Sequence, residues 1–309
     1  MEYSIGVDIG GTKIAAGVVK TDGEVVFKKI VETPRIGRKE ILQVLRNILE
    51  ELMAWANDNG IILKSIGIGT AGQVDYNHGI VLSGTTNIQD WNNIPLRQTI
   101  MEYTDLPVFL DNDVNVLTIS EHLFGAAKGY GNVICLALGT GVGGGVLVNG
   151  TLLRGEWGGA AELGHTSLNI YGELCNCGMR GCLETYASGT WIAKRMQRLY
   201  VSQGKHNDRI SAQDVFRLYM EGNPNAAEVI QLMTKGLSYG IVNFIHTFNP
   251  QLILLGGGVM TDGHWIIPLL QKEINKIGLQ SLVSHVEIKQ SQLSANSGLI
   301  GAAMLKESI

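Results

Sequence analysis

Three clustered cysteines and one histidine carry the strongest chemical signal in this sequence. The cysteines follow the pattern Cys175-x-Cys177-x4-Cys182, and His165 lies ten residues before the first of them. Thiolate and imidazole are ligands that Zn²⁺ prefers, and a set of three cysteines and one histidine fills a tetrahedral structural site. We therefore predict that these four residues bind structural Zn²⁺.

The cysteines could instead form a disulfide or lie apart as buried thiols. Three clustered cysteines leave one without a partner, and the sequence begins with neither a basic nor an apolar leader segment. Close Cys and His spacing without an export signal favours a metal. Gly178 and Gly181 would let the backbone turn tightly enough for three sulfur atoms to converge.

Two carboxylates bracket the metal-binding stretch. Glu162 precedes the histidine by three residues, and Glu184 follows the last cysteine by two. A loop clamped by a metal would hold both carboxylates rigidly. For these two carboxylates, such rigidity suits a polar pocket more than a surface.

Two glycine-rich turns follow apolar strands about half a chain apart. Residues 5–19 predict a hairpin with the turn Gly10-Gly11-Thr12, and residues 133–148 repeat this form with the turn Gly139-Thr140-Gly141. Exposed amides in such turns bind phosphate. A plain hairpin with a tight turn remains open on spacing alone, because the first turn is not a P-loop. The recurrence suggests an internal duplication.

Charged residues accompany the first turn. Lys13 directly follows it and adds positive charge for a phosphate, and Asp8 at the end of the preceding strand could bind Mg²⁺ through water. A third glycine run, Gly256-Gly257-Gly258, follows the predicted strand 251–255. Backbone without side chains would let adenosine lie close, although a strand-to-helix turn that needs one glycine is the simpler interpretation.

Four polar residues stand between a short predicted strand, 107–110, and a predicted helix, 116–124. They are Asp111, Asn112, Asp113 and Asn115. Side chains at such a corner point into a cleft. A helix N-cap is the alternative, but a cap needs only one such residue.

The motifs together identify the sequence as similar to a known family. The segments DIGGTK (8–13), NDVN (112–115), ELGH (162–165), CNCGMRGCLE (175–184) and GGGV (256–259) resemble those of the ROK family of bacterial sugar kinases and sugar-responsive repressors, in the expected order. The resemblance covers nearly the whole chain. It implies an α/β, two-lobed actin-like ATPase fold, which is a duplicated ribonuclease-H-like fold, with a ligand cleft between the lobes.

The lobe boundaries follow from the same resemblance. We expect a small N-terminal lobe of residues 1–118 plus 298–309 and a larger C-terminal lobe of residues 119–297 that carries the zinc loop. Helices are predicted over 40–57, 190–201 and 226–248, and Ser211 with Asp214 forms the pattern of a capping box. The small residues from Asn296 onward predict a helix that packs back on the first lobe.

The resemblance implies ATP-dependent phosphorylation of a hexose at its primary (6-) hydroxyl, with Asp113 as the general base. The intact ELGH suits glucose, as in a glucokinase, while N-acetylmannosamine, N-acetylglucosamine, fructose, mannose and allose remain alternatives. Cofactors would be Mg²⁺ and structural Zn²⁺. The sugar-binding residues implied are Asn87, Asn112, Glu162, His165 and Glu184. The ATP-binding residues implied are Asp8, Gly10, Gly11, Thr12, Lys13, Gly139, Thr140, Gly141, Gly256, Gly257 and Gly258.

Two positions depart from the family pattern. The family usually has Pro where Ala71 stands and often has Asp where Asn296 stands, and we assign Asn296 no role. Asn87 lies in a stretch that resembles the one from which the family's Asn contacts sugar, although an Asn on its own would be interpreted as a turn residue.

Composition limits the partners. The net charge of -4 argues against nucleic acid, and no run of 18 apolar residues suggests a membrane span. We expect a cytoplasmic homodimer or homotetramer, the oligomer on resemblance alone. A repressor of this family would carry a helix-turn-helix module, for which the seven residues before Asp8 leave no room. A sugar-binding module without turnover would not be expected to keep Asp113.

Overall fold

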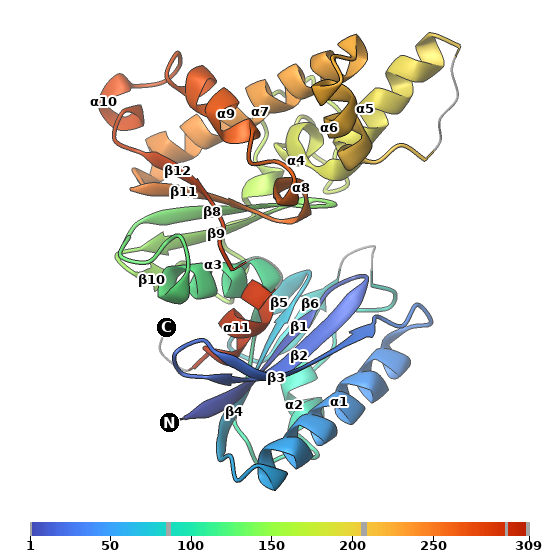
Figure 1. Ribbon diagram of the computed structural model, residues 1–309, viewed down its shortest axis with the longest axis vertical. Helices are drawn as coiled ribbons and strands as arrows, with labels where there is room; N and C mark the ends of the chain where they lie inside the picture. The colour runs from blue at the N-terminus through green and yellow to red at the C-terminus, as the bar shows by residue number, and fades with distance from the viewer. Residues whose placement is uncertain (1, 85–87, 205–208, 294–295, 307–309) are drawn as a thin grey trace. The chain divides into compact units, whose positions relative to one another are not determined.

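The computed structural model describes residues 2–84, 88–204, 209–293 and 296–306 (Figure 1). The chain forms two compact units. The first contains Met1–Gly129, Thr151–Ala160 and Ala295–Ile309, and the second contains Tyr130–Gly150 and Ala161–Ser294. The lobe boundary predicted at residue 118 would cut a helix, because Asp113–Phe124 is one continuous α-helix and lies entirely in the first unit.

The first unit is built on a five-stranded sheet of order β3-β2-β1-β4-β7. The strands are β1 (Tyr3–Ile9), β2 (Lys13–Lys20), β3 (Val25–Glu32), β4 (Leu63–Thr70) and β7 (Val108–Asn112). Strands β1, β2 and β3 pair antiparallel, which confirms the first predicted hairpin, and β1, β4 and β7 pair parallel. A small hairpin of β5 (Gln73–Asp75) and β6 (Ile80–Ser83) lies outside this sheet.

The helix α1 (Arg38–Asp58) confirms the predicted helix over 40–57. Its stripe of Ile41, Leu45, Ile48 and Leu52 is buried, as helical periodicity requires. Two further helices of this unit are α2 (Leu96–Met101) and α3 (Asp113–Phe124).

The helix α11 (Ser297–Ala303) packs against β1, β4 and α3. Small residues make this close approach feasible. A Cβ at Gly67 would lie 1.8 Å from the carbonyl oxygen of Ala302, and one at Gly301 would lie 1.8 Å from that of Val116. The predicted docking of the last helix on the first unit is therefore confirmed.

The second sheet has the corresponding order, β10-β9-β8-β11-β12. Its strands are β8 (Val133–Leu138), β9 (Val142–Val148), β10 (Thr151–Leu152), β11 (Leu252–Gly256) and β12 (Glu287–Gln290). As in the first sheet, a hairpin of two antiparallel strands, β8 and β9, continues into parallel pairs, here β8 with β11 and β11 with β12. The shared order supports the internal duplication inferred from the two glycine-rich turns.

Helices supply most of the core of the second unit. They are η1 (Leu163–His165, a 3₁₀-helix), α4 (Glu184–Ala187), α5 (Gly189–Ser202), α6 (Ala212–Met220), α7 (Pro224–Phe248), α8 (Gly258–Thr261), α9 (Ile266–Ile274) and α10 (Gln280–Val283). The capping box of Ser211 and Asp214 is present at the start of α6. The long helix α7 ends at Asn249, which adopts the left-handed conformation before Pro250.

One predicted boundary is wrong. The helix expected to begin at Val116 begins at Asp113, because the side chain of Asn112 accepts hydrogen bonds from the backbone amides of Val114 and Asn115 and so acts as the N-cap. This polar segment is therefore both a helix cap and a corner between strand and helix.

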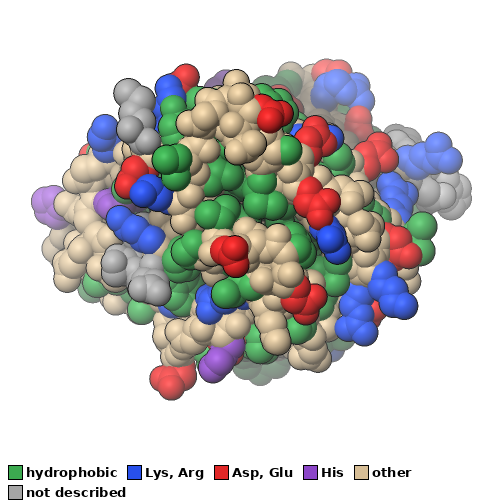
Figure 2. Space-filling model, turned by 90° about the horizontal axis from the view of Figure 1, so that it is seen from below, with side chains coloured by type: hydrophobic (Ala, Val, Ile, Leu, Met, Phe, Trp, Pro, Cys, Tyr) green, Lys and Arg blue, Asp and Glu red, His purple; other side chains and the backbone are tan. Residues whose placement is uncertain are grey.

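Charged side chains of both signs share the surface of the molecule. Figure 2 shows one face, where acidic and basic side chains are intermixed around central hydrophobic ones. Among the residues described, no helix has the length and apolarity needed to cross a membrane.

Candidate functional site

The polar residues between β7 and α3, here called the carboxylate corner, are Asp111, Asn112, Asp113 and Asn115. Both polar atoms of the Asn112 side-chain amide form hydrogen bonds within the protein. Its Oδ1 accepts from the amide of Val114 at 2.8 Å, and its Nδ2 donates to the carbonyl oxygen of Gly72 at 2.9 Å. The side chain that resemblance assigns to sugar binding is therefore fixed by the fold.

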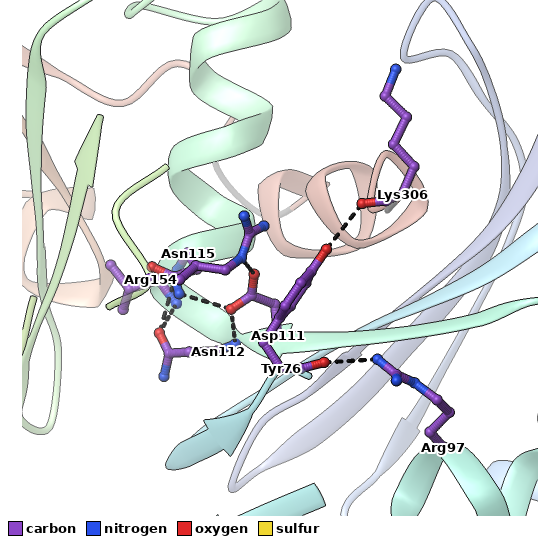
Figure 3. A network of polar contacts seen from close by, with 8 residues as sticks. Tyr76, Arg97, Asp111, Asn112, Asn115, Arg154 and Lys306 are labelled. Atoms are coloured by element: carbon purple, nitrogen blue, oxygen red, sulfur yellow. Dashed lines mark hydrogen bonds and ion pairs between the residues drawn. The ribbon is translucent and has the colours of Figure 1, made fainter. Parts of the chain in front are cut away.

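Asp111 is the most enclosed member of the corner, with 1% of its side chain exposed. Its Oδ1 accepts from the backbone amide of Asn112 at 2.8 Å and from Nδ2 of Asn115 at 2.7 Å, and its Oδ2 accepts from Nε of Arg154 at 2.9 Å (Figure 3). Burial raises the pKa of Asp111, and Arg154 opposes that rise. Sequence reasoning assigned no role to either residue.

Asp8 and Asp113 form a second, less well paired set of carboxylates in the first unit. Burial raises the pKa of Asp8 to about 6, although the charges of Lys13 and Lys28 lower it. Burial and the negative charge of Asp8 together raise the pKa of Asp113 to about 7. Asp113 Oδ1 accepts from the amide of Val114 at 2.9 Å. A carboxylate with this pKa can accept a proton near neutral pH.

The first glycine-rich turn is anchored by its neighbours. The amide of Gly10 donates to the carbonyl oxygen of Lys13 at 3.0 Å, and Thr33 Oγ1 donates to the carbonyl oxygen of Gly10 at 2.6 Å. Thr12 and Lys13 remain exposed to solvent. The start of α11 lies against the strand before this turn, because a Cβ at Gly298 would lie 2.4 Å from Oδ2 of Asp8.

The second glycine-rich turn lies against the start of α5. The amide of Gly189 donates to the carbonyl oxygen of Gly139 at 2.8 Å, and Thr190 Oγ1 donates to that of Thr140 at 2.8 Å. A Cβ built at Gly139 would meet nothing within 4 Å, so its outer side is open. The turn therefore has an open outer side and is held on its other side by the start of α5.

The third glycine run joins β11 to α8. Gly256 ends the strand, and Gly257 has a φ of 86°. A Cβ at Gly257 would lie 2.4 Å from the carbonyl oxygen of Leu138, whereas one at Gly258 would meet nothing within 4 Å. The middle glycine is thus required by the fold. Gly258 leaves open space beside the chain.

Glu184 connects the cysteine-rich loop to the second glycine-rich turn. Its Oε2 accepts from the amide of Val142 at 3.0 Å, and a Cβ at Gly141 would lie 2.5 Å from the same oxygen. The side chain is buried. Glu162, the other bracketing carboxylate, is exposed at the start of η1.

The predicted metal ligands lie together. The side-chain donor atoms of His165, Cys175, Cys177 and Cys182 all lie within 4.8 Å of one another. The two sulfur atoms of Cys177 and Cys182 are 3.6 Å apart, and Nδ1 of His165 is 3.5 Å from Sγ of Cys175. In a tetrahedral Zn²⁺ site the corresponding separations are about 3.8 Å and about 3.5 Å. The donor set therefore fits such an ion.

A glycine shapes the loop that carries these donors. Gly181 has a φ of 65°, and a Cβ at this position would lie 2.0 Å from the carbonyl oxygen of Asn169. Cys135, the remaining cysteine, is buried in β8 and is not part of the metal cluster.

Two further positions were singled out in the sequence. Asn87 lies outside the described residues. Asn296 accepts a hydrogen bond through its Oδ1 from Nζ of Lys28. The predicted residues thus form one group in the first unit, around Asp8 and Asp113, and a second group in the second unit, around Glu184 and the cysteines.

Known proteins resemble this chain along nearly its whole length, and the duplicated sheets match the actin-like ATPase fold of solved ROK kinases. A sequence model of the ROK family matches residues 4–309. The chain belongs to the ROK family. The glucokinase of Thermotoga maritima is 35% identical, over 99% of this chain and 98% of that protein.

Two other relatives bear on function. The structure of a ROK family glucokinase from Streptomyces griseus in complex with glucose and AMPPNP is 32% identical, has a TM-score of 0.82, and covers 97% of this chain and 98% of that one. The xylose repressor of Bacillus subtilis is 28% identical over 98% of this chain and 76% of its own length. Kinases and a repressor therefore share this architecture.

Proposed function

We propose that this protein is an ATP-dependent kinase that phosphorylates the primary (6-) hydroxyl of a hexose, with glucose as the first candidate. The observation that carries the proposal is Asp113, a carboxylate at the first position of α3 whose pKa is raised to about 7. Similarity to two glucokinases, at 35% and 32% identity over nearly the whole chain, supports the substrate class.

Asp113 would act as the general base. It takes the proton of the sugar hydroxyl while that oxygen forms a bond to the γ-phosphorus of ATP and the bond to the ADP oxygen breaks. A base with a pKa near the working pH is ionised in about half of the molecules and is still basic enough to accept the proton. Phosphoryl transfer otherwise needs positioning and neutralisation of charge rather than covalent catalysis.

The backbone of the three glycine segments would bind ATP. The turns Gly10–Lys13 and Gly139–Gly141 would offer amides to the phosphates, with Lys13 adding a positive charge. The glycine run Gly256–Gly258 would accept adenosine, with the open space at Gly258 beside it. Asp8 would hold Mg²⁺ through water, and this ion would neutralise charge on the phosphates.

The sugar-binding role is proposed for Asn87, Asn112, Glu162, His165 and Glu184. Hydrogen bonds within the protein limit which atoms of these side chains could bind a sugar. Asn112 already uses both ends of its amide in the fold, and Glu184 uses Oε2 for the amide of Val142. His165 directs Nδ1 toward the cysteines, which leaves Nε2 for a sugar hydroxyl.

Structural Zn²⁺ would be held by His165, Cys175, Cys177 and Cys182. When bound, it would fix the loop that ends at Glu184 and so hold this carboxylate beside the second glycine-rich turn. We also propose that the protein is a cytoplasmic homodimer or homotetramer whose two lobes are the two compact units. Light scattering of the purified protein tests the oligomer.

The experiment that tests the function is an assay of ADP release with ATP and Mg²⁺. The panel is glucose, mannose, fructose, allose, N-acetylglucosamine and N-acetylmannosamine, and ³¹P NMR identifies the phosphorylated hydroxyl. Turnover on one sugar, abolished in Asp113→Asn, supports the proposal. A folded, metal-loaded protein that turns over none of these sugars refutes it.

A second candidate is a sugar-responsive regulator, because a xylose repressor matches 98% of this chain. This hypothesis predicts sugar binding without turnover. Calorimetric titration of the protein with the same sugars and with xylose distinguishes the kinase from the regulator. A regulator would bind a sugar that the assay leaves unphosphorylated.

A further inference from the structure

Arg154 reaches the carboxylate corner from a segment that contains none of the motifs of the site. It lies in Thr151–Ala160, which is part of the first unit although the residues on both sides belong to the second. Its ion pair with Asp111 is enclosed, with 12% of the arginine side chain and 1% of the aspartate side chain exposed. Figure 3 shows the arginine beside the end of β7 and the start of α3.

Asp111 transmits the position of Arg154 to both elements that flank Asp113. One oxygen accepts from the backbone amide of Asn112, which ends β7. The same oxygen accepts from Nδ2 of Asn115 in the first turn of α3. A single carboxylate thus holds the strand end and the helix start together, with Asp113 between them.

The arginine is in turn held by a fixed aromatic ring. Its guanidinium carbon lies 4.1 Å from the ring centroid of Tyr76. The hydroxyl of Tyr76 donates to the carbonyl oxygen of Lys306 at 3.0 Å, and the amide of Tyr76 donates to that of Trp157 at 2.7 Å. Arg97 donates from Nη2 to the carbonyl oxygen of Tyr76 at 2.8 Å. The ring is anchored through its hydroxyl, and the backbone of Tyr76 is held by the other two hydrogen bonds.

We propose that Arg154 is a positioning residue for phosphoryl transfer, which sets the orientation of Asp113 through Asp111. The proposal rests on the proposed kinase function. Stability alone is a weak reason for this pair, because a buried ion pair is commonly no more stabilising than apolar residues of the same size. Catalysis is a stronger reason, since a misplacement of about 1 Å can slow a reaction about 100-fold.

The test compares Arg154→Met with Arg46→Met. Arg46 also lies over a tyrosine ring, that of Tyr103, and pairs with a carboxylate, that of Glu50, so it shares the kinds of contact but not the partners of Arg154. We expect Arg154→Met to lower kcat about 10- to 100-fold with KM for ATP changed less than about 2-fold. We expect Arg46→Met to keep kcat within about 2-fold, with folding of both variants checked by circular dichroism at the assay temperature.

A double variant separates positioning from loss of fold. Arg154→Met leaves the charge of Asp111 buried without its partner, and this can unfold the protein. The double variant Asp111→Asn with Arg154→Met removes both charges, so it should fold even where the single variant does not. A folded double variant with kcat still reduced at least 10-fold supports the proposal.

Three results would overturn the inference. They are a folded Arg154→Met with wild-type kcat, an equal loss of kcat in Arg46→Met, and a double variant with kcat restored to the wild-type value. In all three the wild-type enzyme is active and the proposed function stands. A wild-type protein without turnover on any sugar refutes the proposed function and this inference together.

Discussion

The carboxylate corner of the first unit and the cysteine-rich loop of the second hold their polar groups in opposite ways. In the corner, acidic side chains are crowded into a partly buried region, and the pKa of Asp113 is raised to about 7, with that of the interacting Asp8 in β1 raised to about 6. In the loop, four donor atoms lie within 4.8 Å of one another in an arrangement that fits a cation.

This difference indicates what each region is suited to do. A carboxylate whose charge is poorly compensated is destabilising but basic, which suits proton transfer. Donors arranged around a metal gain stability from it and become rigid, which suits the fixing of nearby groups such as Glu184. Asp111 and Asp113 repeat the contrast at close range. Asp111 is paired with an arginine, whereas the charge of another carboxylate, Asp8, raises the pKa of Asp113.

The largest effect is expected from Asp113→Asn. The amide keeps the size of the side chain but cannot accept the hydroxyl proton, so kcat should fall about 100- to 10,000-fold. Sugar affinity measured by calorimetry should stay within about 3-fold. A turnover near that of the wild type would show that the base is another group. The carboxylate corner could then no longer be contrasted with the metal loop as the region that transfers protons.

A smaller effect is expected from Cys177→Ser, which removes one donor of the metal cluster. Bound zinc measured by atomic absorption should fall from one ion per chain toward none, and the KM for sugar should rise about 10- to 100-fold. Cys135→Ala is the matched control, because Cys135 is a cysteine outside the cluster. Full zinc content in Cys177→Ser would exclude this ligand set.

The pH dependence of kcat/KM tests the corner directly. Asp113 must be ionised to act as the base, and its pKa is about 7. Activity should therefore fall about tenfold per pH unit below pH 7 and level off above it. Asp8→Asn removes the negative charge that raises the pKa of Asp113, so the fall should move to lower pH. A profile that is flat between pH 5.5 and pH 8 contradicts the assignment.

Much of the fold could be predicted from the sequence because the signals are local. The apolar stripe of α1, the paired strands around Gly10 and Gly139, and the capping box at Ser211 depend on residues that are close in the chain. The metal cluster is similar, since its cysteines lie within one loop. The predicted start of α3 is three residues late, because a polar run contains both a cap and a first turn.

The partners that hold the site together could not be predicted, because they are distant in the chain. Arg154 and Asp111 are 43 residues apart, and Tyr76 and the backbone of Lys306 are 230 residues apart. The bond from Glu184 to the amide of Val142 spans 42 residues. No residue pattern marks such pairs, and only the folded sheets bring them into contact.

The smallest expected effect concerns stability and follows from the sign of the pKa shift. The pKa of Asp113 in the folded protein, about 7, lies above the ordinary value of 3.8, so the folded state binds this proton more tightly than the unfolded state. Stability is therefore lost as the pH rises from about 4 to about 7, and the full penalty remains at pH 8. Asp113→Asn removes the penalty and should raise the free energy of unfolding at pH 8 by about 1–4 kcal/mol, with little change near pH 4.

Asp111→Asn is the matched comparison. Burial raises the pKa of Asp111 as well, but Arg154 opposes that rise and loses its charged partner in this variant. Asp111→Asn should therefore raise the free energy of unfolding at pH 8 less than Asp113→Asn does. Urea unfolding at the two pH values measures both variants. If Asp111→Asn stabilises the protein at pH 8 as much as Asp113→Asn, the difference between the paired and the unpaired carboxylate is not real.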